Sequence, residues 1–109
     1  GVRLRGVLRR DSRADAAPRL LEIARAAVGA SDEARFERCH LLELSPAGLV
    51  FELCYFLSTR EPVAAAATQQ QINLQLLQAL RQGGLELAEP MPLLAPPLSG
   101  SGTSASSRG

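Results

Sequence analysis

Apolar and polar residues alternate strictly at the start of the chain. The positions on one side are Val2, Leu4, Gly6 and Leu8, and those on the other are Arg3, Arg5, Val7 and Arg9. A period of two is typical of a half-buried strand, because successive side chains of a strand point to opposite faces. The pattern therefore predicts a strand over residues 2–9.

The period then changes from two to that of a helix. Apolar residues recur at Leu20, Leu21, Ala24, Ala27 and Val28. This spacing predicts an amphipathic helix with one buried stripe. Ser12 or Asp15 is suited to cap its start, Pro18 is tolerated in its first turn, and Gly29 is placed to end it.

Two further apolar runs, 36–44 and 49–57, flank the turn sequence Ser45-Pro46-Ala47-Gly48. Proline and glycine at these positions predict a type I turn and hence an antiparallel hairpin. If Leu44 pairs with Leu49, Cys39 lies opposite Cys54. A glycine bulge at Gly48 would shift this register by one residue and separate the two cysteines.

The segment 64–82 contains neither Gly nor Pro and predicts a second helix. Its expected buried stripe is Ile72, Leu76, Ala79 and Leu80, widened by Leu74 and Leu77. Gly83-Gly84 ends this helix, and Leu85-Glu86-Leu87 alternates as a short last strand.

The predicted order is β-α-β-β-α-β, the ferredoxin-like arrangement of the α+β class. We expect a four-stranded antiparallel sheet with both helices on one face. The predicted domain spans residues 1–90. Residues 91–109 form a Pro/Ser/Gly-rich tail, in which 91–98 cannot be a regular central strand and 99–109 are expected to be mobile.

Composition narrows the class of protein. With 109 residues the chain suffices for one domain, and with 4% aromatic residues and no Trp its core must be mainly aliphatic. The net charge of +1 argues against a nucleic-acid binder. All basic residues are Arg, which indicates either a codon bias or a guanidinium surface for carboxylates or phosphates.

Candidate chemistry is sparse. His40 is the only histidine, and with Cys39 and Cys54 it lacks the fourth ligand of a zinc site. Neighbours on a strand point to opposite faces, so His40 cannot easily activate Cys39 as a nucleophile. We predict no catalytic residue, no metal site and no cofactor. The two cysteines are expected to be reduced, as in an intracellular protein. If Cys39 and Cys54 face each other on the sheet, the alternative is a pair that can be oxidised or acts as a redox latch.

One surface is more informative. In the register above, the sheet face away from the helices mixes apolar residues with acids: Cys39, Leu41, Val50, Cys54 and Phe56 with Glu37, Glu43 and Glu52. An uncovered sheet face is normally more polar than this. We therefore take Leu41, Val50, Cys54 and Phe56 as a candidate subunit-contact face. The polar residues Gln69, Gln70, Gln71 and Asn73 indicate either a second such contact or a solvated helical face.

Several segments occur together in an order that resembles a known family. They are the acid Glu52 within an apolar strand, the helix sequence Gln69-Gln70-Gln71-Ile72-Asn73-Leu74, and the last segment Gly84-Leu85-Glu86-Leu87 followed by Pro90. Upstream of Glu52 lies the sequence Ala34-Arg35-Phe36-Glu37-Arg38-Cys39-His40. Over residues 2–92 the chain resembles the C-terminal cytoplasmic domain of the small-conductance mechanosensitive (MscS-type) channel family.

The resemblance implies a non-catalytic domain of an osmotic-stress release channel. In that family several subunits, seven in the best-known members, enclose a vestibule below the pore. We would then expect a homo-oligomer in the inner (plasma) membrane, with this domain in the cytoplasm and no nucleic-acid partner. Membrane residence would come from segments outside this chain, since it has no run of roughly 18 to 20 apolar residues.

The chain departs from the family after the domain. The family closes its cage floor with a small barrel, but Glu89 stands where an aromatic residue is common, and Pro92, Pro96 and Pro97 interrupt the segment.

The main alternative is a ferredoxin-like regulatory or ligand-binding module that dimerises through its sheet. An RNA-recognition module is disfavoured, because the two central strands of this chain offer only Phe56 as an exposed aromatic residue on the outer face. A small enzyme on the same fold, such as an acylphosphatase, is ranked last, because Asn73 is the only Asn and lies within a predicted helix.

Overall fold

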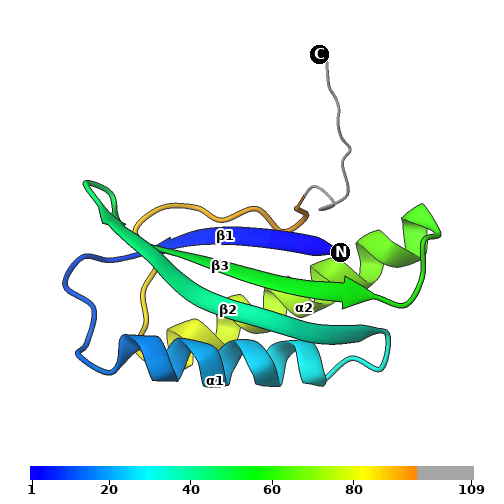
Figure 1. The fold of residues 1–109 in the computed structure, drawn as a ribbon, viewed down its shortest axis with the longest axis horizontal. Coiled ribbons are helices and arrows are strands. Elements are labelled where there is room, and N and C mark those ends of the chain that lie inside the picture. Colours follow the sequence, from blue (N-terminus) through cyan, green and yellow to red (C-terminus); the bar gives the residue numbers. More distant parts are fainter. Residues whose placement is uncertain (96–109) are drawn as a thin grey trace, which may run out of the picture.

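The computed structural model of the chain describes residues 1–95 and shows a sheet with both helices on one side (Figure 1). The elements are β1 (Val2–Leu8), α1 (Ala16–Gly29), β2 (Ala34–Ser45), β3 (Gly48–Leu57) and α2 (Pro62–Gln82). The three strands are antiparallel in the order β1-β3-β2. The predicted α+β class is confirmed, as is the order of these five elements.

The core lies between the sheet and the helices. Every second residue of β1 from Val2 to Leu8 is buried on this side. From the helices it receives stripes that include Leu20 and Val28 of α1 and Ile72 and Leu76 of α2. Aliphatic side chains dominate it, as the low aromatic content predicts.

The two helices begin in different ways. Asp15 precedes α1, but its carboxylate makes no capping bond and instead pairs with Arg13 and Arg19. At α2 the carboxylate of Glu61 accepts bonds from the backbone N–H groups of Val63 (3.2 Å) and Ala64 (2.8 Å). This cap explains why α2 begins at Pro62, two residues before the predicted start.

The hairpin between β2 and β3 is tight because of Ser45 and Gly48. The Ser45 hydroxyl accepts bonds from the backbone N–H groups of Ala47 (3.1 Å) and Gly48 (3.3 Å). Gly48 has φ of 149°, and a Cβ there would lie 2.1 Å from the carbonyl oxygen of Leu8. Only glycine fits this approach to β1.

Two bulges in β2 change the expected register. Leu44 pairs with Leu49 as predicted, but irregularities between Leu41 and Glu43 and between Phe36 and Arg38 each shift the pairing by one residue. A one-residue shift turns side chains to the opposite face.

The bulges overturn the predicted placement of two residues. Cys39 lies opposite Leu53 and Leu41 lies opposite Phe51, so both turn toward the helices and contact the core. Cys54 pairs instead with Arg38. Both cysteines are free, and they sit on opposite faces of the sheet.

The predicted last strand is reduced to a single bridge. Leu87 pairs antiparallel with Leu8, flanked by bonds from Arg9 N to Glu86 O (2.9 Å) and from Ala88 N to Val7 O (2.7 Å). The segment thus docks beside the free edge of β1. A single bridge is too short to count as a strand. The segment follows a turn at Gly84, where φ is 77°.

Packing against the domain continues beyond Pro90. Met91 and the ring of Phe51 occupy the space that a side chain at position 6 would need, which explains Gly6. Ala95 is buried in the core cluster. The remaining tail, including the segment expected to be mobile, lies outside the described residues.

Candidate functional site on the outer face of the sheet

The sheet face away from the helices is called the outer face here. Its residues follow from the register of the three strands: Arg3, Arg5 and Val7 of β1; Val50, Glu52, Cys54 and Phe56 of β3; and Arg35, Arg38, His40 and Glu43 of β2. No helix covers this face in Figure 1. Within residues 1–95, the side chains of the face itself lie over its central strand.

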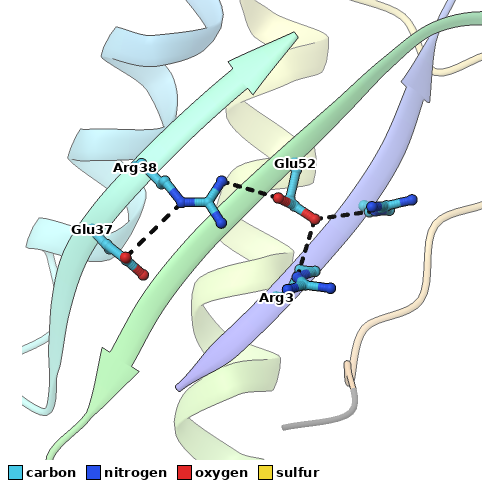
Figure 2. A network of polar contacts seen from close by, with 5 residues as sticks. Arg3, Glu37, Arg38 and Glu52 are labelled. Atoms are coloured by element: carbon cyan, nitrogen blue, oxygen red, sulfur yellow. Dashed lines mark hydrogen bonds and ion pairs between the residues drawn. The ribbon is translucent and has the colours of Figure 1, made fainter. Parts of the chain in front are cut away.

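Glu52 stands at the centre of the outer face and is only 4% exposed. One carboxylate oxygen lies 3.1 Å from the Nε atoms of both Arg3 and Arg5, and the other lies 3.0 Å from an Nη of Arg38. Figure 2 shows Arg3 and Arg38 reaching Glu52 from the strands on either side. The carboxylate thus ties all three strands together.

The ionised form of Glu52 is favoured despite its burial. Burial alone would raise the pKa of this carboxyl group. Hydrogen bonds from Arg5 and Arg38 and the positive charges of Arg3 and Arg5 outweigh that effect, so the pKa of Glu52 lies below its ordinary value. Glu52 is therefore a carboxylate at neutral pH.

The cluster around Glu52 is not electrically balanced. Glu37 adds a second carboxylate, 3.9 Å from Arg38 Nε. Three guanidinium groups thus face two carboxylates, and Arg35 stands further along the same face. The arginines remain partly open to solvent, with 48%, 59% and 38% of the side chains of Arg3, Arg5 and Arg38 exposed.

The apolar residues of the outer face lie beside arginines. Cys54 has no exposed surface, and its direct neighbours across the two ladders are Arg3 and Arg38. Burial raises the pKa of the Cys54 thiol. The guanidinium of Arg35 lies 5.2 Å above the ring of Phe56, a cation–π contact. We infer that arginine stems take the place of a helix as the cover of this face.

The four residues of the candidate contact face are therefore not equivalent. Phe56 is 37% exposed and Val50 is half-buried on the outer face. Cys54 lies on the outer face but is buried, and Leu41 lies on the other face. Only Phe56 and Val50 offer outer-face surface to a partner.

A buried polar link on the helix side was not anticipated. Asn73 is fully buried, accepts a hydrogen bond from the Tyr55 hydroxyl (3.1 Å) and donates one to the carbonyl of Leu93. Gln69 accepts a bond from the backbone N–H of Ala95 (3.2 Å). Burial raises the pKa of Tyr55 to about 12. The sequence indicated a solvated face or a subunit contact for Gln69 and Asn73. In the structure both bind residues 93–95 of the same chain.

The remaining candidate residues lie at separate places in the part of the chain that the structure describes. Within residues 1–95, no three His, Cys, Asp or Glu side chains are placed to hold a metal ion. A hollow of about 800 Å³ opens at the start of α2, and Arg60 is the one charged side chain that lines it. His40 is exposed on β2, and burial raises the pKa of Cys39 to about 12.

Comparisons with protein-family models, with curated proteins and with solved structures give no significant match. Neither α1 nor α2 has the combination of length and apolar character needed to cross a bilayer, among the residues that the structure describes. The class defined by fold and site is thus a small α+β domain with an arginine-covered sheet.

Proposed function

We propose that this chain is the cytoplasmic vestibule and assembly domain of an MscS-type mechanosensitive channel. The resemblance over residues 2–92 supports this assignment. The observation that carries it furthest is the docking of residues 86–88 on β1, through the Leu8–Leu87 bridge and the two backbone bonds beside it.

This docking is compatible with the finer fold expected of the family. A strand at that position would lie outside β1 and complete the order 4-1-3-2 of a ferredoxin-like βαββαβ domain. The bridge therefore supports the full ferredoxin-like arrangement as part of the proposal.

The proposed role is non-catalytic. Copies of the domain would form a ring around the vestibule of an inner-membrane channel, with the membrane-spanning segments encoded outside these 109 residues. A closed ring uses heterologous contacts, in which one surface of a subunit meets a different surface of its neighbour. Phe56 and Val50 remain the outer-face residues proposed for such a contact.

Two experiments test the assignment. The first is to read the coding sequence upstream of Gly1. Apolar runs of about 20 residues followed by a β-rich linker are expected, whereas a start codon near Gly1 or a soluble domain there would favour the regulatory module that dimerises through its sheet.

The second experiment expresses the full-length gene in bacterial cells that lack their own mechanosensitive channels. Survival after hypo-osmotic shock should rise, and a gene truncated before this domain serves as the matched control. Equal survival with an empty vector, despite verified membrane expression, would contradict the proposed function.

A further inference from the structure

The positive charge of the outer face exceeds what its own carboxylates neutralise. Four arginines, Arg3, Arg5, Arg35 and Arg38, stand on or beside this face against three carboxylates, Glu37, Glu43 and Glu52. Arg3, Arg5 and Arg38 share Glu52, while Glu43 lies at the far end of β2. Each guanidinium carries five N–H donors in a planar fork. The contacts with Glu52 use only a small part of this donor set, so donors remain for an incoming anion.

The strands set the spacing of these donors. Arg3 and Arg5 are two residues apart on β1, so their Cα atoms are about 6.8 Å apart, the same distance that separates alternate residues of any extended segment. A strand with carboxylates at every second residue would therefore match them in register. On β2, by contrast, Glu37 and Glu43 repel acids, which favours the β1 side of the face.

We propose that the outer face binds an extended acidic segment of another protein, with carboxylates at alternate residues aligned along Arg3 and Arg5. The planar forks of arginine suit carboxylates by shape as well as by charge. The proposal does not depend on the channel assignment, because it rests only on the charges and register of this face.

A second copy of this domain does not fit as the occupant. None of the acids in the 109 residues are two positions apart. If two outer faces stacked in register with β1 over β2, Arg3 would face Arg38 and Arg5 would face His40 of the other copy. Neither of these residues is an acid that could pair with an arginine. If β1 stacked on β1, no acid of that strand would face the arginines.

Nucleic acid is also a poorer match. Base stacking requires several free aromatic surfaces. Within residues 1–95 Phe56 is the one aromatic side chain of the outer face, and Arg35 lies over its ring. A small free anion would gain little, because Arg3, Arg5 and Arg38 stand on an open sheet face with 48%, 59% and 38% of their side chains exposed.

The test uses two synthetic eight-residue peptides of equal composition and charge. One alternates Glu and Thr, and the other carries four Glu followed by four Thr. Binding to the isotope-labelled 109-residue chain is followed by NMR at low and at physiological salt. The alternating peptide should bind more tightly, shift the amide signals of β1 and β3, and lose affinity with salt.

Matched variants distinguish binding at the outer face from a general attraction between opposite charges. Arg3→Gln/Arg5→Gln should weaken binding by about tenfold, since each exposed ion pair contributes up to about 1 kcal/mol. Arg25→Gln/Arg81→Gln removes the same charge from the helices and should leave the affinity unchanged. Circular dichroism checks that each variant is folded. If Arg3→Gln/Arg5→Gln does not fold, the map of NMR shifts in the wild-type protein still decides between the outer face and the helices.

Three results would overturn the proposal. They are equal binding of the two peptides, a shift map centred on the helices, and tighter binding of an eight-nucleotide oligothymidine than of the alternating peptide. The last result would assign the face to nucleic acid instead.

Discussion

The two faces of the sheet are dry at their centre for different reasons. Residues 51–55 of β3 are all buried although they alternate between the faces. On the inner face, Phe51, Leu53 and Tyr55 are covered by α1 and α2. On the outer face, Glu52 and Cys54 are covered by arginines from β1 and β2. The inner face should therefore gain stability from apolar area, and the outer face from a charge cluster that salt and pH can modify.

The strongest test of this contrast uses the same substitution on both faces of β3. Phe51 is fully buried, whereas Phe56 is 37% exposed beneath Arg35. Phe51→Ala should lower the free energy of unfolding by about 3–5 kcal/mol because it leaves a cavity in the core. Phe56→Ala should cost about 1 kcal/mol. Urea denaturation of both variants measures the difference, and similar losses would contradict the contrast.

The polar link within the inner face gives the next largest effect. Asn73→Ala leaves the Tyr55 hydroxyl and the Leu93 carbonyl without their partner, which should cost about 2–3 kcal/mol. Gln70→Ala, an exposed change on the same helix, is the matched control and should cost under about 0.5 kcal/mol. Equal stability of these two variants would show that the link contributes nothing.

A smaller effect is expected from the charge cluster of the outer face. Glu52→Gln keeps the shape but removes the charge that three arginines share, and should cost about 1–2 kcal/mol at neutral pH. Because the arginines are partly exposed, added salt should reduce this cost. Urea denaturation at low and high salt measures it. A cost that does not change with salt would argue for packing rather than charge.

The same variant predicts a pH dependence. The pKa of Glu52 in the folded protein lies below the ordinary glutamate value of 4.5. Its stabilising contribution is therefore complete above about pH 4.5 and is lost as pH falls through the folded pKa. The stability difference between wild type and Glu52→Gln should be constant near neutrality and should shrink progressively as pH falls below 4.5 toward the folded pKa. A constant difference down to pH 3 would contradict the lowered pKa.

Much of the fold followed from local patterns, because period two and helical spacing identify strands and helices directly. The missing part lies in β2, where two bulges break the period without a Gly or Pro to mark them. For this reason Cys39 and Leu41 were placed on the wrong face. Alternation over the three residues 85–87 was also too short a pattern to distinguish a full strand from the single bridge at Leu87.

The candidate site was harder to predict than the fold. Glu52 was recognised as an acid on the outer face, but its burial depends on Arg3, Arg5 and Arg38 converging from two other strands. Such convergence follows from the register and not from sequence spacing. The burial of Asn73 could have been predicted from the sequence. It falls within the apolar stripe that contains Ile72 and Leu76, where a polar residue normally has a buried hydrogen-bond partner.

The two cysteines report on the two kinds of cover separately. Both thiols are buried with raised pKa values, so both should react slowly with iodoacetamide at pH 8. Arg38→Ala removes a direct neighbour of Cys54 and also a charge that lowers the pKa of its thiol. The gain in access should outweigh the loss of thiolate and speed alkylation several-fold, while Cys39 beneath the helices stays slow. Mass spectrometry of the two peptides measures both rates in one sample, with Arg81→Ala as the control. If both rates rose together, the variant would be opening globally, and the arginines would not be the specific cover of the outer face.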